Sequence, residues 1–171
     1  MRTALTRLTH LSNNLADQTS TMASPQGLDI QKIAMIGCGS MGGGMAQLFA
    51  EKGIRVSLSD PSPDAMDNVL SAAKKSDERN KTNIASMISK HDDYDSLTKS
   101  LHSPKVFVWS LPHGGVGDTV LEGLMGYLEK GDVIIDCGNE HWENTERRQG
   151  KCVTKGIRYV GCGVSGGYQA A

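Results

Sequence analysis

From Lys32 onward, short runs of β-branched and apolar residues alternate with longer segments whose apolar positions have helical spacing. This alternation is typical of βα units around a parallel sheet, because a helix usually makes the crossover between parallel strands. The pattern predicts strands at Lys32–Ile36, Arg55–Ser59, Lys105–Leu111, Val133–Asp136 and Arg158–Val160. A further strand is predicted near Thr82–Ala85.

Helices are predicted between these strands, and capping residues define several of their ends. Ser62 offers an N-cap oxygen before Pro63, and Gly53 and Gly156 are suitable C-terminal stops. The predicted helices are Met41–Lys52, Pro63–Ser76, Asp93–Leu101, Gly117–Leu128 and Asn144–Lys155. Together these elements predict an α/β domain over residues 29–171, with a doubly wound, mainly parallel sheet.

The composition suits one soluble domain and excludes some classes of partner. A chain of 171 residues with 38% hydrophobic content can bury one ordinary core but is short for two domains. The 18 basic and 19 acidic residues give a formal charge of -1, so we expect no nucleic-acid partner. The longest apolar runs are far shorter than the roughly 20 residues of a membrane-spanning helix, so we expect no membrane association.

The four cysteines form neither a C-x-x-C pair nor a zinc-ligand spacing; they are Cys38, Cys137, Cys152 and Cys162. We therefore expect no metal site and reduced thiols, which favours a reducing compartment such as the cytoplasm. Residues 1–28 are rich in Ser, Thr and Asn, with Arg2 and Arg7 and no acid before Asp17. This composition fits a disordered leader or a transit peptide, and a transit peptide would imply a mitochondrial or other organelle location.

A glycine-rich segment follows the first predicted strand and opens the first helix. Its G-x-G-x-x-G pattern predicts cofactor-binding residues at Gly37, Cys38, Gly39, Ser40, Met41, Gly42 and Gly43. Gly37 permits a tight turn, Gly39 removes a Cβ where a pyrophosphate approaches, and Gly42 allows close packing of helix on strand. Backbone N–H groups at the helix start then face the pyrophosphate. The pattern predicts a Rossmann-type dinucleotide site, and the alternative is a glycine-rich turn without a ligand.

Asp60 ends the second predicted strand, 23 residues after Gly37, close to the spacing of about 20 in dinucleotide-binding folds. A carboxylate there accepts hydrogen bonds from the adenosine ribose hydroxyls and repels a 2′-phosphate, so NAD is expected. The alternative is that Asp60 only starts the turn Asp60-Pro61-Ser62, a common role for aspartate. The two roles are compatible, and all three residues are predicted to border the cofactor.

Three motifs resemble those of the 6-phosphogluconate dehydrogenases, within the β-hydroxyacid dehydrogenase superfamily. They are the glycine loop, Gly131-Asp-Val-Ile-Ile-Asp-Cys-Gly-Asn139 and Gly161-Cys-Gly-Val-Ser-Gly-Gly167. The resemblance implies oxidative decarboxylation of 6-phosphogluconate to ribulose 5-phosphate, in the pentose phosphate pathway, with NADP or NAD as cofactor. It also implies that Asn139 contacts substrate and the nicotinamide end of the cofactor. The residues implied to contact the phosphorylated sugar acid are Ser165, Gly166 and Gly167.

The chain departs from the family pattern at three places around the expected site. Asp60-Pro61-Ser62 stands where NADP-dependent members have Asn-Arg-Thr, so these residues favour NAD while the family favours NADP. Leu111-Pro112-His113 replaces the family's Val-Lys-Ala, and these three residues are predicted to contact the cofactor. Tyr168 replaces a glutamate after the Ser-Gly-Gly turn.

In the family, the general base and general acid stand on a helical domain beyond the Ser-Gly-Gly turn, and that domain also makes the homodimer. Because the printed chain ends at Ala171, no catalytic residue is assigned, and this chain is expected to bind dinucleotide without turning over substrate. A homodimer is expected only for the full-length architecture. Two other functions stay open: an NAD-linked dehydrogenase of another 3-hydroxy acid, and a non-catalytic dinucleotide-binding module.

Further candidate residues each have a plainer interpretation. His113 and His141 are candidate acids or bases, and the plainer interpretation is a polar loop residue. Cys38, near a helix N-terminus, is either an oxidisable thiol or a small space-filling residue. The charged segment from Glu140 to Arg148, with Glu143, Glu146 and Arg147, is interpreted as a solvated helix start. Trp142 is interpreted as an ordinary packing residue, with the edge of the site as the alternative.

Overall fold

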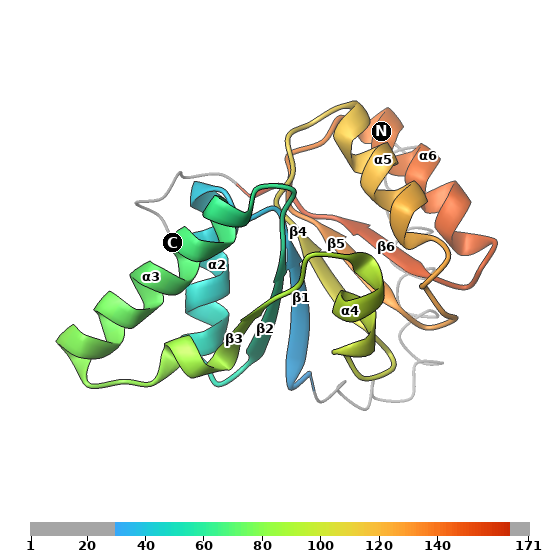
Figure 1. Cartoon of the computed structure of the whole chain (residues 1–171). Helices are drawn as coiled ribbons and strands as arrows, with labels where there is room; N and C mark the ends of the chain where they lie inside the picture. Colours follow the sequence, from blue (N-terminus) through green and yellow to red (C-terminus); the bar gives the residue numbers. More distant parts are fainter. Residues whose placement is uncertain (1–29, 165–171) are drawn as a thin grey trace, which may run out of the picture.

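The structure is a computed structural model that describes residues 30–164, so the predicted leader over residues 1–28 lies outside the described residues. The strands are β1 (Lys32–Ile36), β2 (Arg55–Ser59), β3 (Ile88–Lys90), β4 (Val106–Trp109), β5 (Val133–Asp136) and β6 (Arg158–Gly161). They form one sheet in the order β3-β2-β1-β4-β5-β6, and every neighbouring pair is parallel (Figure 1).

Helices connect the strands and cover both faces of the sheet. They are α2 (Ser40–Glu51), α3 (Pro63–Asn80), α4 (Tyr94–Lys99), α5 (Gly115–Leu124) and α6 (Trp142–Val153), with a short 3-10 helix, η1 (Ile84–Met87). Figure 1 shows α2 and α3 on one face, and α5 and α6 on the other, which confirms the predicted doubly wound α/β fold. None of the helices described here is long and apolar enough to cross a bilayer.

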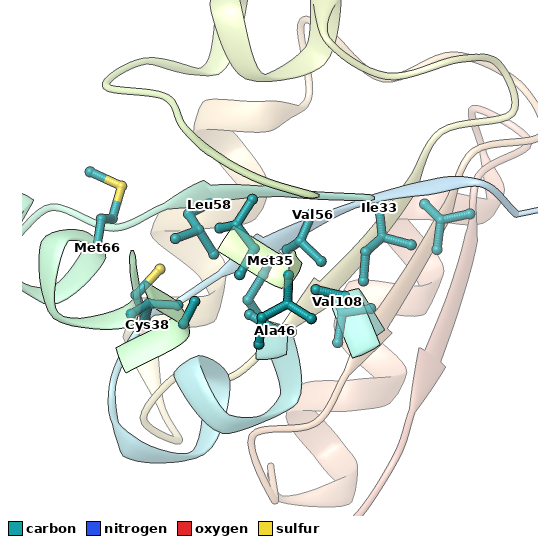
Figure 2. Packing of buried hydrophobic residues seen from close by; sticks show 14 residues of the cluster. Ile33, Met35, Cys38, Ala46, Val56, Leu58, Met66 and Val108 are labelled. Atoms are coloured by element: carbon teal, nitrogen blue, oxygen red, sulfur yellow. The ribbon is translucent and has the colours of Figure 1, made fainter. Parts of the chain in front are cut away.

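The core consists of two layers, one on each side of the sheet. Ile33 and Met35 of β1 pack under α2 and α3, whereas Ala34 and Ile36 face the layer beneath α4, α5 and α6. This division follows from the two-residue period of a strand. Figure 2 shows the first layer, where side chains of three strands meet two helices: Ile33, Met35, Val56, Leu58, Val108, Ala46 and Met66.

The prediction of a strand near Thr82–Ala85 is wrong, because β3 begins later, at Ile88, which pairs with Val56. Two of the backbone N–H groups of that segment donate to the carboxylate of Asp77 at 2.7 and 2.9 Å, so they are not available to a neighbouring strand. The preceding helix also continues to Asn80, four residues beyond its predicted end. The other boundaries differ from the predicted ones by at most four residues.

The strand order creates a topological switch point between β1 and β4. From β1 the chain winds through β2 and β3 toward one edge of the sheet, then returns to β4 and winds toward the other. The connections therefore leave in opposite directions at the carboxyl ends of β1 and β4. Ligands of doubly wound sheets bind in the crevice at such a point.

Candidate functional site

A cleft of about 1060 Å³ opens at this switch point. Its walls come from the glycine loop after β1, the end of β2, the loop after β3, the turn after β4 and one side of α5. The volume lies just above the range of about 300 to 1000 Å³ that is usual for ligand pockets. An extended ligand with two nucleotide halves therefore suits the cleft better than a small metabolite.

Eight of the predicted cofactor residues line this cleft: Gly37, Gly39, Ser40, Met41, Asp60, Pro61, Leu111 and Pro112. The structure thus brings together three segments that are far apart in the sequence. Six predicted cofactor residues are not among those that line it: Cys38, Gly42, Gly43, Ser62, His113 and Asn139.

The three glycines of the fingerprint have different roles. At Gly37 φ is +90°, and an added Cβ would lie 2.3 Å from the carbonyl oxygen of Ser110. At Gly42 an added Cβ would lie 1.9 Å from the carbonyl oxygen of Gly37, so α2 packs against the loop only without a side chain there. A Cβ at Gly39 would meet no atom within 4 Å. The tight turn predicted at Gly37 and the close packing predicted at Gly42 are confirmed, and open space adjoins Gly39.

The N-terminus of α2 borders the same open space. The helix has no side-chain cap at Gly39 and no acidic residue in its first turn, and Ser40 and Met41 line the cleft. The first N–H groups of a helix have no partner within the helix and carry partial positive charge. This arrangement is suited to a phosphate or pyrophosphate group.

Asp60 holds the glycine loop against the end of β2. One carboxylate oxygen accepts the N–H of Cys38 at 2.7 Å, and the other accepts the N–H of Ser62 at 2.8 Å. The turn role considered for Asp60 is therefore confirmed, and the hydroxyl of Ser62 caps α3 at the N–H of Ala65. Each carboxylate oxygen keeps a further lone pair. The ribose contact of Asp60 stays a prediction.

Cys38 is a space-filling residue of the glycine loop. Only 4% of it is exposed, and its side chain belongs to the core layer under α2 and α3 (Figure 2). Burial, together with the negative charge of Asp60, raises the pKa of the Cys38 thiol to about 12. Its burial and raised pKa favour this space-filling role over an oxidisable thiol.

A smaller hollow of about 380 Å³ contains Asn139, at the ends of β5 and β6. Asn139 has a φ of 54°, and its side-chain amide donates to the carbonyl oxygen of Val164. The structure therefore places Asn139 beside the segment that leads into the Ser-Gly-Gly motif. The predicted substrate residues Ser165, Gly166 and Gly167 lie outside the described residues.

The interpretation of the charged segment as a solvated helix start holds for Glu143, Glu146 and Arg147, which are exposed, but is wrong for Glu140 and Arg148. The side chain of Arg148 is fully buried, and it pairs with Glu140 at 2.9 Å, Asp118 at 3.1 Å and Asp136 at 3.5 Å. It also donates to the carbonyl oxygen of Gly114 at 2.6 Å. We call these four charged residues the Arg148 cluster. The sequence carried one signal for it, since Arg148 lies four residues before the buried Cys152 on the same helix face.

The Arg148 cluster joins the loop that carries Asn139 to the start of α5, which forms one wall of the cleft. Glu140, the residue after Asn139, accepts the N–H of Gly114 at 2.8 Å while it pairs with Arg148. A buried charge network of this kind holds its segments in one arrangement, because moving any of them leaves an unpaired charge. The cluster therefore positions both the hollow and the cleft.

Glu140 makes the stability of this region sensitive to acid. Burial raises its pKa, but hydrogen bonds from two backbone N–H groups and from Asn144 and Arg148 lower it more strongly, to about 2, against the usual 4.5. Its ionisation therefore stabilises the fold above pH 4.5, and this contribution is lost as the pH falls toward 2. We expect Glu140→Gln to flatten the dependence of the unfolding free energy on pH across this window, measured by urea denaturation. An unchanged slope would contradict the assignment.

The histidines and Trp142 lie at the surface. His113 is exposed, and His141 is 62% exposed with its ring 3.8 Å from the carboxylate of Glu143, so both fit the polar loop interpretation. Trp142 is 61% exposed and lines the hollow that contains Asn139. The packing interpretation of Trp142 is therefore wrong, and it lies at the edge of the site. Among residues 30–164, no three metal-ligating side chains are grouped.

A glycine loop of this geometry at a switch point, with an acid at the end of β2, defines a dinucleotide-binding Rossmann domain. A family model described as the NAD binding domain of 6-phosphogluconate dehydrogenase matches residues 32–171. The chain belongs to this family, as its three motifs predicted.

Relatives and solved structures agree with this assignment. The decarboxylating 6-phosphogluconate dehydrogenase of Emericella nidulans is 40% identical over 134 residues, which cover 77% of this chain and 26% of the relative. The NAD(+)-dependent decarboxylating enzyme of Bacillus subtilis is 35% identical over 135 residues, which cover 79% of this chain and 27% of that relative. The 6-phosphogluconate dehydrogenase of Plasmodium falciparum was solved in apo form and with NADP+ or 6-phosphogluconate. Its structure matches this chain with a TM-score of 0.73 at 26% identity, and the match covers 81% of this chain and 28% of that one. This chain spans about a quarter of the length of these relatives.

Proposed function

We propose that this chain binds a nicotinamide dinucleotide in the cleft and is the cofactor-binding part of a 6-phosphogluconate dehydrogenase. The observation that carries the proposal is the open space at Gly39, next to the uncapped N-terminus of α2 and inside the cleft. A pyrophosphate group fits there, because its charge complements the free N–H groups. The family assignment and the switch-point position support the same ligand.

The reaction of the whole protein is proposed to be oxidation of 6-phosphogluconate followed by loss of CO₂, which gives ribulose 5-phosphate. When bound, the dinucleotide would supply the hydride acceptor, and the protein would supply orientation and electrostatics. In this chain, α2 and Asp60 hold the dinucleotide, and Leu111 and Pro112 border it at the end of β4. Asn139, Ser165, Gly166 and Gly167 are proposed to contact the sugar acid.

We further propose that the cleft prefers NAD to NADP. Three carboxylates line it, those of Asp60, Asp92 and Asp93, and none of the described lining residues is Lys or Arg. A 2′-phosphate near these residues would meet negative charge without the cationic partner that it requires. The Bacillus subtilis relative, described as NAD(+)-dependent, shows that this preference occurs in the family. The Plasmodium falciparum structure was solved with NADP+, so the family includes both cofactors.

Parallel calorimetric titrations of the chain with NAD and NADP test both proposals. We expect NAD to bind at least about tenfold more tightly, a difference of about 1.4 kcal/mol. Asp60→Asn removes the charge but keeps one acceptor oxygen for the N–H groups, so it is expected to narrow this difference. Tighter binding of NADP to the unmodified chain would refute the preference, and failure of both dinucleotides to bind would refute the cofactor site.

A further inference from the structure

Two cysteines follow the neighbouring parallel strands β5 and β6, which lie side by side in Figure 1. The last pair of this ladder joins Asp136 to Gly161, so the next residues, Cys137 and Cys162, stand opposite each other. The N–H of Cys162 donates to the carbonyl oxygen of Asp136 at 2.8 Å, and a bridge joins the two residues that follow the cysteines. Pairing on both sides therefore holds the cysteines in register.

This register meets the geometric conditions for a disulfide. Neighbouring strands lie about 4.8 Å apart, and residues opposite each other direct their side chains to the same face. Disulfides join residues whose Cα atoms are about 4.4 to 6.8 Å apart. Consistent with this geometry, the thiol of Cys162 interacts directly with that of Cys137. The Cα spacing of this register therefore suits a disulfide between Cys137 and Cys162.

The two thiols differ in access to solvent. Cys162 is exposed, whereas Cys137 is half-buried and packs against the core layer under α2 and α3. Burial, together with the neighbouring Cys162, raises the pKa of Cys137 to about 11, so Cys137 is protonated at neutral pH. An oxidant in solution therefore reaches Cys162 first. The other cysteines, Cys38 and Cys152, are 4% and 0% exposed and offer no competing site.

We propose that Cys137 and Cys162 form a dithiol site that hydrogen peroxide closes to a disulfide. First, the thiolate sulfur of Cys162 attacks a peroxide oxygen, the O–O bond breaks, and the departing hydroxide takes the proton that the thiol released. The sulfur of Cys137 then attacks the resulting sulfenic sulfur, the S–O bond breaks, and water leaves with the proton of Cys137. Two thiols thus lose two electrons, and one peroxide becomes two water molecules.

The disulfide would tie together the two segments that border the hollow at Asn139. Cys137 lies two residues before Asn139, and Cys162 lines the hollow itself. Closing the bond therefore restricts the segment that carries a proposed substrate residue, and a dithiol reductant restores it. The dithiol site follows from strand register and does not depend on the proposed cofactor, so each proposal fails or stands separately.

The test uses the full chain, fully reduced, desalted and exposed to hydrogen peroxide near neutral pH. We expect the intact mass to fall by about 2 Da and a digest to contain one cross-linked peptide pair that joins Cys137 to Cys162. Dithiothreitol should reverse both changes. Sulfinic or sulfonic acid on Cys162 beside a free Cys137 would overturn the proposal, as would a disulfide between two chains through Cys162.

Two variants and a second probe complete the test. Cys137→Ser removes the resolving thiol, so dimedone should trap a sulfenic acid on Cys162. Cys152→Ser changes a buried cysteine away from the pair and should form the same cross-link as the unmodified chain. Phenylarsine oxide, which bridges two nearby thiols, should be retained at least about tenfold more strongly by the unmodified chain than by Cys162→Ser. Because this probe needs no oxidation, equal retention of phenylarsine oxide by the two proteins would overturn the dithiol site itself.

Discussion

Replacing Arg148 by methionine is expected to lower the free energy of unfolding by about 3 to 5 kcal/mol. The change removes the guanidinium that pairs with Asp118, Asp136 and Glu140, and the side chains of Asp136 and Glu140 are only 4% and 5% exposed. Buried carboxylates without a cationic partner are strongly destabilising, because a charge is poorly solvated in the interior. Urea denaturation near pH 7, followed by circular dichroism, measures the loss.

Arg147→Met is the matched control for this experiment. Arg147 is the next residue, carries the same charge and also pairs with Asp118, at 2.6 Å, but its side chain is 49% exposed. An exposed pair contributes only about 0 to 1 kcal/mol, since solvent screens it and both side chains lose freedom. Equal losses in the two variants would show that the burial of Arg148 is not what stabilises this region.

Gly42→Ala is expected to have the second large effect, because it damages both the fold and dinucleotide binding. The new Cβ would lie 1.9 Å from the carbonyl oxygen of Gly37, a backbone atom that cannot move without displacing the glycine loop. Forcing extra atoms into a packed contact costs about 1 to 3 kcal/mol. We expect a lower melting temperature, together with a loss of NAD affinity of more than about tenfold in calorimetry.

Gly39→Ala separates packing from ligand contact. Its Cβ would meet no atom within 4 Å, so the melting temperature should be nearly unchanged. The methyl group would instead occupy the space proposed for the pyrophosphate, and NAD affinity should fall at least about tenfold. Full NAD affinity in Gly39→Ala would contradict the position of the pyrophosphate, and a normal melting temperature of Gly42→Ala would contradict the packing argument.

Much of the fold could be predicted because its signals are local. The bounds of β1, β2 and β5 match their predicted ranges, and the Ser62-Pro63 pair correctly marks the start of α3. A cap or a strand period depends on residues a few positions apart, which the sequence displays directly. The strand predicted near Thr82–Ala85 was wrong because of a tertiary contact. Two of the backbone N–H groups of that segment donate to the carboxylate of Asp77 in the preceding helix.

The part of the site that could be predicted is the part where only one residue type fits the backbone. The glycine loop needs residues without a Cβ at Gly37 and Gly42, and the structure confirms both contacts. The environment of Arg148 could not be predicted in the same way, because its partners Asp118 and Asp136 come from α5 and β5. Whether a charged residue is solvated or buried depends on which segments pack over it.

By itself, the sequence therefore determined the alternation of strands and helices, the glycine loop with its dinucleotide chemistry, and the family motifs. Only the tertiary structure decided that Arg148 is buried among carboxylates, that Trp142 is exposed at the site edge, and that Cys137 stands opposite Cys162. The difference is physical. Backbone conformation and capping depend on near neighbours in the chain, whereas charge burial and thiol pairing depend on contacts that exist only after distant segments pack together.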